Sequence, residues 1–305
     1  MSDNKNLSSG SVVRKSDKPK KSKPREYFDA LIYAAVVAFI IKVFLFEAYR
    51  IPTGSMENTL LVGDFLLVTK FTYGATTPRN VPFTDIRLPY FKLPGFKKPK
   101  VGDIIVFDYP GDRDERDSKE VLNYIKRCVG LPGDTIQVTN RVLYNNGKIF
   151  PNPPNSKFVS ALQPPNYVNT RIFPKGVNWN EDNYGPIRIP KEGDRIYIDS
   201  ANFDRWRMFI IKEGYKSVNF VNGKLMLDNI ETPENVYITK SDYLFMMGDN
   251  RNNSLDSRFF GFVPVRNVVG EALIIYWSWD ANLSFAQFFD LVKSIRWNRI
   301  FKLIQ

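Results

Sequence analysis

The chain begins with a polar stretch that gives way abruptly to an apolar one. Residues 1–25 consist mainly of Ser, Lys, Asn and Pro, whereas the seventeen residues 30–46 contain a single charged side chain, that of Lys42. Seventeen apolar positions are at the lower limit for a helix that spans a bilayer, and the long Lys42 side chain can reach the interface from near one end. We therefore predict a solvated tail over residues 1–27 and a transmembrane helix over residues 28–47.

Two other interpretations of the apolar stretch stay open. A cleaved signal peptide has a similar organisation, but the next residues, 47–50, read Glu-Ala-Tyr-Arg and contain no small-x-small cleavage site. A buried core helix is the second interpretation, and the basic cluster from Lys15 to Arg25 argues against it. The same cluster predicts that the N-terminus stays in the cytoplasm and that the chain after Phe46 is exported.

Beyond the apolar stretch, short apolar runs alternate with turn signals, which is typical of a strand-rich protein. The expected strands are Phe65–Phe71, Asp103–Tyr109, Val121–Val129, Thr135–Thr139, Arg195–Asp199, Val236–Thr239, Tyr243–Met247 and Gly270–Trp277. Asn146-Gly147 and Asn222-Gly223 each separate two apolar runs and predict hairpin turns. Helix is expected at Asn202–Lys212 and near the C-terminus, so the body is predicted to be mainly antiparallel β.

Composition narrows the classes of function. The net charge is +11, but residues 1–25 carry eight basic and two acidic side chains, which leaves a mildly basic body and only a weak indication of nucleic-acid binding. The chain has no histidine and one cysteine, Cys128, so it cannot form an intramolecular disulfide. A transition-metal site is disfavoured for the same reason, and we predict no metal and no cofactor.

Ser55 is the first candidate for chemistry. Gly54 allows a tight turn that exposes the serine hydroxyl, and the Thr53 hydroxyl can add a donor for an oxyanion. A serine nucleophile normally uses a histidine as its base, and this chain has none. A lysine is the leading alternative, although a Gly-Ser pair is also an ordinary turn.

Lys126 is the candidate base. It lies on a predicted strand with Ile125, Val129 and Leu131 nearby, and these apolar neighbours can remove water from the ammonium and lower its pKa. A lysine in the middle of a strand more often faces solvent.

A polar loop over residues 247–264 precedes an aromatic cluster. Asp249, Arg251, Asp256 and Arg258 can pair with one another and fix the loop, which is a structural role. Ser254 can hydrogen-bond a neutral lysine and orient it.

Taken together, four ordered blocks resemble bacterial type I signal peptidases, also called leader peptidases. The blocks are Ser55-Met56, Gly63-Asp64 with Lys70, Lys126-Arg127 with Gly130 to Asp134, and Gly248 to Arg251 with Ser254 to Arg258. The resemblance implies that Ser55 is the acylating nucleophile and Lys126 the general base. It implies further that Ser254 orients the lysine, that Thr53 and the Ser55 amide form the oxyanion hole, and that Arg127 and the acids and arginines of the loop are structural.

The resemblance also implies an architecture. We expect an antiparallel catalytic core over residues 48–144 and 241–280 and a smaller β-rich domain inserted at residues 145–240. The residue pattern itself, with large apolar side chains mixed with Lys and Arg, predicts an amphipathic C-terminal helix over residues 281–305. That helix either lies on the membrane or packs on the body. The family often has proline three residues after the serine, where this chain has Asn58.

The implied substrates are secretory pre-proteins with small-x-small cleavage sites. The implied location is the bacterial inner membrane, in contact with lipid, with one transmembrane segment, a cytoplasmic N-terminus and a periplasmic catalytic domain. The alternatives are a self-cleaving serine–lysine repressor, which would need an N-terminal DNA-binding domain, a membrane-anchored binding protein without catalysis, and a basic nucleic-acid binder.

Overall fold

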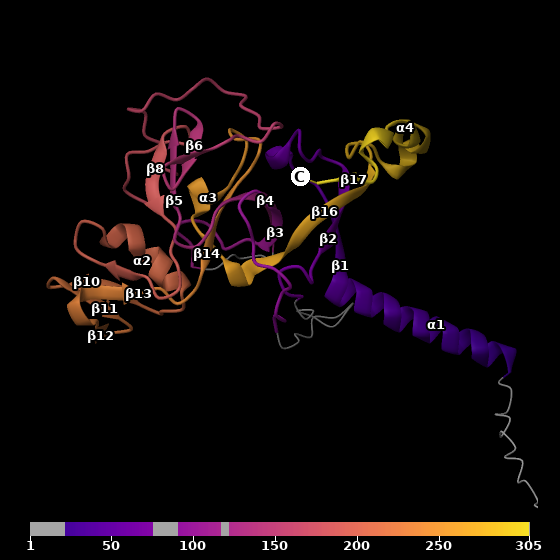
Figure 1. Cartoon of the computed structure of the whole chain (residues 1–305), viewed down its shortest axis with the longest axis horizontal. Helices are drawn as coiled ribbons and strands as arrows, with labels where there is room; N and C mark the ends of the chain where they lie inside the picture. The colour runs from indigo at the N-terminus through magenta and orange to yellow at the C-terminus, as the bar shows by residue number, and fades with distance from the viewer. Residues whose placement is uncertain (1–21, 76–90, 117–121, 305) are drawn as a thin grey trace, which may run out of the picture. The chain divides into compact units, whose positions relative to one another are not determined.

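The computed structural model describes residues 22–75, 91–116 and 122–304 (Figure 1). The predicted tail up to residue 21 and much of the proline-rich connection after residue 75 lie outside these ranges. The chain divides into two compact units, Met1–Ile41 and Lys42–Gln305.

The first unit contains helix α1, Lys23–Ile40. A π-helical turn, Ile41–Leu45, continues it in sequence, and the segment Lys23–Leu45 is long and apolar enough to cross a membrane. None of the residues of α1 is buried in the described part of the chain, which argues against a core helix. The helix begins earlier than predicted because Pro24 falls in its first turn, where a missing amide donor costs nothing.

The second unit is built on one large antiparallel sheet with the strand order β1-β2-β16-β3-β4-β14-β15, and β17 pairs with β16. Its strands are β1 Phe46–Arg50, β2 Asp64–Thr69, β3 Ile104–Asp108, β4 Asn123–Gly130, β14 Tyr243–Met247, β15 Val263–Pro264, β16 Val268–Ser278 and β17 Lys302–Leu303. This arrangement confirms the mainly β, antiparallel fold class. The predicted strand at Val121–Val129 begins at Asn123, and Val121 lies outside the described residues.

Strand β14 is buried on both faces. Tyr243, Phe245 and Met247 belong to one hydrophobic core, while Leu244 and Met246 belong to another. Successive side chains of a strand point to opposite faces, so an uninterrupted apolar run is what a doubly covered strand requires. The strand therefore joins the large sheet to the smaller sheets that pack beside it (Figure 1).

Three smaller sheets complete this unit. The first has the order β7-β6-β5-β8, the second pairs β9 with β13, and the third has the order β10-β11-β12. Their strands are β5 Thr135–Thr139, β6 Val142–Asn145, β7 Lys148–Phe150, β8 Tyr184–Arg188, β9 Arg195–Tyr197, β10 Val218–Val221, β11 Lys224–Leu227, β12 Ile230–Glu231 and β13 Val236–Ile238. Because β5 pairs with both β6 and β8, the four-stranded sheet begins before the expected boundary at residue 145.

Both predicted hairpin turns are confirmed. Asn146 and Gly147 connect β6 to β7, and Asn222 and Gly223 connect β10 to β11. All four residues have positive φ, the conformation that a two-residue turn of this type requires. The predicted helix at Asn202–Lys212 is also confirmed as α2, Phe203–Lys212.

The prediction of one amphipathic helix over residues 281–305 is wrong. The segment forms α4, Phe288–Lys293, between two 3-10 turns, Phe285–Gln287 and Trp297–Arg299, and then β17. The segment leaves the helical conformation because the Arg299 guanidinium binds the buried Asp64 carboxylate, with Nε 3.0 Å from Oδ1. This buried ion pair and the β16–β17 pairing draw the segment onto the sheet, and tertiary contacts override helix propensity.

Candidate active site

Ser55 lies in a short turn that the core holds in place. The 3-10 turn Gly54–Met56 follows Thr53, whose backbone is extended. Met56 and Ile51 are packed in the core beneath the turn, at 1% and 3% exposure. Ser55 itself is buried within the turn, so the surrounding structure fixes the direction of its hydroxyl.

Lys126 lies on β4 and meets Ser55. The Nζ of Lys126 is 2.8 Å from the Oγ of Ser55 and donates a second hydrogen bond to the carbonyl oxygen of Ile125 at 2.9 Å. Lys126 is only 4% exposed. Burial lowers the pKa of its amine from 10.5 to about 8, and the nearby carboxylates of Asp256 and Asp249 oppose that shift. A substantial fraction of the amine is therefore neutral near pH 8 and can accept a proton.

The face of β4 that carries Lys126 is partly aromatic. Tyr124 lies two residues before Lys126, on the same side of the strand. The Lys126 Nζ is 5.2 Å from the centre of the Tyr124 ring, which in turn stacks on Tyr109 with 4.4 Å between ring centres. These rings exclude water from one side of the amine.

A cavity of about 310 Å³ opens over the Ser55–Lys126 pair. Its lining comprises Ile51, Pro52, Thr53, Gly54, Ser55, Asn123, Tyr124, Ile125, Lys126, Asn253 and Leu255. Thr53 is exposed at this cavity, and its side chain forms no capping hydrogen bond to the turn. The structure thus brings three of the predicted site residues, Thr53, Ser55 and Lys126, to one cavity.

Ser254 lies close to the Ser55 turn without bonding to the lysine. Its hydroxyl is buried and has no hydrogen-bond partner among the described residues. Gly248 separates it from the nucleophile: a Cβ placed on Gly248 would lie 2.2 Å from the Ser254 Oγ and 2.6 Å from the Ser55 carbonyl oxygen. Gly248 therefore packs closely against both serines.

Arg127 and Asp249 form a buried bidentate ion pair. Arg127 donates to the two Asp249 oxygens at 2.9 and 2.8 Å, and the Thr59 hydroxyl donates to Oδ2 at 2.6 Å. Arg127 follows the lysine, and Thr59 follows the Ser55 turn. The Asp249 carboxylate therefore joins the strand of the base to the segment of the serine.

Asp256 and Arg258 form a second buried pair. Arg258 donates to both Asp256 oxygens at 2.9 and 2.8 Å, and the Gly248 amide donates to Oδ2 at 3.1 Å. Asp256 also accepts from the Arg258 amide and so begins the short helix α3, Ser257–Phe260. Burial acts to raise the pKa of the Asp256 carboxyl, but the Arg258 charge and the hydrogen bonds that the carboxylate accepts, from Arg258 and the Gly248 amide among others, together outweigh it and lower the pKa.

Arg251 departs from the expected pairing with an acid of the loop. Its one side-chain hydrogen bond within the described residues goes from Nη1 to the Asn152 Oδ1, at 2.8 Å. Burial, and then repulsion by Arg258, lowers the pKa of Arg251 to about 10. This arginine therefore fastens the loop to the segment that contains Asn152, outside the motif.

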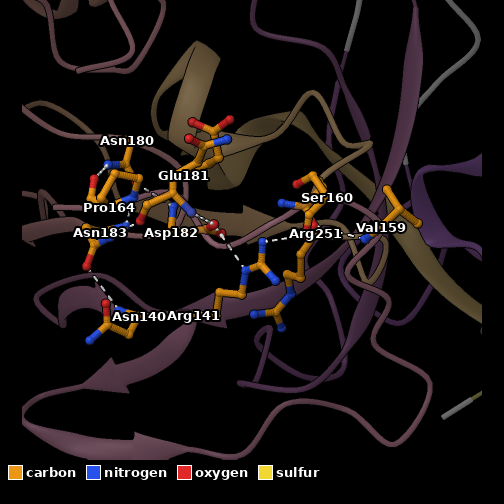
Figure 2. Close-up of polar contacts among 12 residues, drawn as sticks. Asn140, Arg141, Val159, Ser160, Pro164, Asn180, Glu181, Asp182, Asn183 and Arg251 are labelled. Carbon is orange, nitrogen blue, oxygen red and sulfur yellow. Dashed lines mark hydrogen bonds and ion pairs between the residues drawn. The ribbon is translucent and has the colours of Figure 1, made fainter. Parts of the chain in front are cut away.

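Residues 157–160 run beside the motif loop. The Lys157 amide donates to the Asp249 carbonyl at 2.8 Å, and the Arg251 amide donates to the Lys157 carbonyl at 2.9 Å. Figure 2 shows how this segment is held: Arg141 reaches Asp182 at 3.0 Å and donates to the Ser160 carbonyl at 2.9 Å. The segment between the two halves of the core thus supports the motif loop.

Sequence reasoning missed Asn250. Its amide nitrogen Nδ2 donates to the Gly54 carbonyl at 2.9 Å and to Glu57 Oε2 at 3.2 Å, and its backbone amide donates to the Ser55 carbonyl at 3.1 Å. Lys157 pairs with the same Glu57 oxygen at 3.0 Å. Asn250 lies inside the fourth block, but no residue type in the Ser55 turn pointed to it as a partner.

Comparison with known proteins decides the family. The family model described as "Signal peptidase, peptidase S26" matches residues 24–277, which is most of the chain. The chain belongs to this signal peptidase family. The match contains all the site residues that the four sequence blocks brought forward.

Curated relatives agree with this assignment. Signal peptidase I of Buchnera aphidicola subsp. Acyrthosiphon pisum is 36% identical over 87% of this chain and 80% of its own length. Signal peptidase I of Pseudomonas aeruginosa is 30% identical over 83% and 72%. A crystal structure of a signal peptidase I from Enterococcus faecalis V583 is 20% identical over 57% of this chain and 97% of that chain, with a TM-score of 0.26, which is too low to support an argument from superposition.

Family membership confirms the enzyme class predicted from the motifs. Signal peptidases of this family are serine endopeptidases, so the chain is a hydrolase of this class. The apolar N-terminal segment Lys23–Leu45 is consistent with a membrane-anchored member. Secretory precursors are the substrates that this family membership implies.

Proposed function

We propose that this enzyme removes signal peptides from secretory precursors with Ser55 as nucleophile and Lys126 as general base. The observation that carries the proposal is the 2.8 Å contact between Lys126 Nζ and Ser55 Oγ. The lowered pKa of the buried lysine supports it, because only the neutral amine can take the serine proton. Family membership supports the reaction itself.

The reaction begins when Ser55 Oγ attacks the carbonyl carbon of the scissile peptide bond. The serine proton passes to Lys126 Nζ, and the negative charge moves to the carbonyl oxygen. Lys126 then gives its proton to the nitrogen of the mature protein, which leaves as an amine while the signal peptide stays on Ser55 as an ester. A water molecule, deprotonated by Lys126, attacks the ester carbonyl. The Ser55 oxygen then leaves and takes the proton back from Lys126, and the signal peptide is released as a carboxylic acid.

The oxyanion is assigned to the Ser55 amide and the Thr53 hydroxyl. Thr53 lines the cavity beside Ser55 and its side chain makes no capping bond, so its hydroxyl can turn toward the substrate. Ser254 is assigned the orientation of Lys126, because its unpartnered hydroxyl lies behind the Ser55 turn. Arg127, Asp249, Arg251, Asp256 and Arg258 have the structural role of fixing the loop.

Substrates are proposed to be pre-proteins whose signal peptides end in a small-x-small pattern. The cavity over Ser55 is rimmed by Ile51, Ile125, Tyr124 and Leu255, so it offers apolar walls to small side chains. An extended substrate chain can bind there by adding to the exposed start of β4, where Asn123 is exposed.

The proposed location is the bacterial inner membrane. Residues 28–47 would span it, the basic residues 1–27 would stay in the cytoplasm and residues 48–144 with 241–280 would act as a periplasmic catalytic core in contact with lipid. Residues 145–240, together with β5 and β6 before them, would form the second domain. Nucleic acid is not a proposed partner, because the excess charge is concentrated before residue 26.

The test is cleavage of a pre-protein by the purified full-length enzyme in detergent. The product's new N-terminus, determined by sequencing, should follow a small-x-small site. Ser55→Ala and Lys126→Ala should each abolish processing, whereas Lys224→Ala, an exposed lysine on β11 paired with Glu231, should not change it. Processing that survives either of the first two substitutions refutes the assigned pair.

A further inference from the structure

A second cavity lies between the C-terminal strand β17 and the segment that follows β7. Its volume is about 560 Å³, which is within the usual range for a pocket that holds a small organic ligand. Apolar side chains form most of its wall, including Phe150 and Pro151 at the end of β7 and Leu303 and Ile304 at the end of β17. Among the described residues, none lines both this cavity and the one that contains Ser55.

The fold holds both walls of this cavity in place. On one side, the Asn152 Oδ1 accepts a hydrogen bond from the Arg251 guanidinium at 2.8 Å. On the other side, β17 pairs with β16, and the Ile304 amide donates to the Leu273 carbonyl at 3.0 Å. The cavity is therefore formed before a ligand binds, and binding costs little ordering of the chain.

The cavity has one cation that a ligand can reach. Arg127 and Lys302 line it, and none of its lining residues in the described part of the chain is acidic. Arg127 is paired with Asp249, so its charge is already neutralised. Lys302 is exposed, and its amine has no ion pair or hydrogen bond with any residue that the structure describes.

The two walls carry no acidic side chain that could neutralise Lys302. Residues 141–160, which include one wall, and residues 291–305, which include the other, contain no Asp and no Glu. The Lys302 charge is therefore left for a ligand.

We propose that this cavity binds a carboxylate with an unbranched hydrocarbon tail, that is, a medium-chain fatty acid. One available cation favours an anion with a single negative charge, and a carboxylate has one near neutral pH. Pro151, Pro153 and Pro154 have no backbone N–H, so this wall suits a hydrocarbon better than an added peptide strand, which would need backbone donors. The site goes beyond the proposed peptidase reaction and does not depend on it.

A bound tail would contact the buried pair that lies next to Lys126 in sequence. Thr59 and Arg127 both line the cavity, and both donate to the Asp249 carboxylate. The ligand would therefore pack against residues that link the strand of the proposed base to the segment of the serine, while it occupies a space separate from the substrate.

Isothermal titration calorimetry tests the proposal, with sodium octanoate as the probe. The full-length protein is placed in phosphatidylcholine nanodiscs, which avoids free detergent tails, and a blank titration into empty nanodiscs is subtracted. Octanoate should bind more tightly than acetate, which lacks the tail, and more tightly than octanol, which lacks the charge.

Variants of the two ends of the site locate the binding. Lys302→Gln should weaken octanoate binding by about threefold to fivefold, which is the size of an exposed charge pair, and Lys302→Arg should keep most of it. Leu303→Gln should also weaken binding. Both side chains are exposed, so neither variant should unfold. Lys224→Gln and Ile230→Gln, also exposed but on β11 and β12, are the matched controls and should bind octanoate as the wild type does.

Three results would overturn the proposal. They are no measurable octanoate binding, equal affinity of octanoate for the wild type and Lys302→Gln, and equal binding of octanol and octanoate. Tighter binding of octyl phosphate than of octanoate would overturn the assignment to a carboxylate and indicate a phosphate headgroup instead. These titrations do not measure peptidase activity, so their failure would leave the proposed catalytic pair untouched.

Discussion

The Lys126 amine lies 2.8 Å from the Ser55 hydroxyl, although 71 residues separate the two in sequence. Strand β4 brings the amine to this point, and the turn after β1 brings the hydroxyl. The contact is buried, and the loss of water lowers the pKa of the lysine. The fraction of neutral amine at a given pH is therefore larger than it would be for a lysine in solvent.

Peptidase activity should rise with pH through an apparent pKa of about 8. Burial lowers the Lys126 pKa to about 8, and the neutral amine that accepts the serine proton accumulates above that value. The measurement is kcat/KM for a pre-protein or peptide substrate between pH 6 and 10. A profile with no midpoint near 8 that is still rising steeply at pH 10 would show that the base is a solvated lysine.

Lys126→Met should stabilise the folded protein below pH 8. The folded-state pKa of Lys126 lies below its unfolded value of 10.5, so the unfolded chain binds more protons between pH 8 and 10.5. The free energy of unfolding of the wild type therefore falls as the pH is lowered through this range. The part of the unfolding free energy that is due to protonation of Lys126 is about 3 kcal/mol below pH 8 and vanishes well above pH 10.5. Methionine does not have this penalty. Denaturant unfolding of the wild type and Lys126→Met at pH 7 and pH 10 measures it, and a gap that does not shrink with pH would contradict the burial argument.

Ser55 and Lys126 could be brought forward as a candidate pair from the sequence because the local sequence around each residue suggests its chemistry. A serine after glycine, and a lysine near Ile125, Val129 and Leu131, can be recognised from their neighbours in sequence. The four ordered blocks then linked the two residues through the resemblance to a family. The strands, the Asn-Gly hairpins and α2 were predictable for the same reason, since each depends on residues close together in the chain.

What could not be predicted depends on distant contacts. The C-terminal segment has a helical pattern, but Arg299 binds Asp64, more than two hundred residues away, and breaks the pattern. Asn250 braces the Gly54 carbonyl across a similar separation. In both contacts, the sequence around one residue contains no signal that identifies its distant partner.

Asn250→Ala should reduce kcat more than it raises KM. The substitution removes the side-chain bonds to the Gly54 carbonyl and Glu57, so the turn that carries Ser55 loses a brace while the apolar cavity walls stay. A loss of about tenfold in kcat corresponds to one such bond.

Glu57→Gln is the matched control for this brace. The Glu57–Lys157 pair is about one third exposed on both sides, and such pairs contribute about 1 kcal/mol or less. Activity of Glu57→Gln should therefore stay within a few-fold of the wild type. If Glu57→Gln reduced activity as much as Asn250→Ala does, the Glu57–Lys157 ion pair, and not the Asn250 side-chain amide, would be what positions the Ser55 turn.

Gly248→Ala should disrupt the site by steric overlap. A methyl group there would lie 2.2 Å from the Ser254 Oγ and 2.6 Å from the Ser55 carbonyl, and only the first of these neighbours can rotate away. We expect a loss of about 1–3 kcal/mol in unfolding free energy together with most of the activity. Gly54→Ala, whose new methyl group would meet nothing closer than 3.6 Å, should keep the wild-type Tm and serves as the comparison.

Asn58→Pro should destabilise the turn even though related enzymes often carry proline at this position. Asn58 has φ of 74°, whereas proline fixes φ near −65°, so the ring would force the backbone out of its present conformation. The next residue, Thr59, would move with it and lose its bond to Asp249, which binds Arg127, the neighbour of Lys126 on β4. Asn58→Gly should be tolerated, because glycine adopts positive φ freely. Thermal unfolding and kcat/KM of the two variants provide the measurement, with a loss of more than about 1 kcal/mol expected for proline alone. If the proline variant matched the wild type in both, the turn would have to adopt the negative φ that proline requires, and the Thr59–Asp249 bond would have to form from that backbone instead.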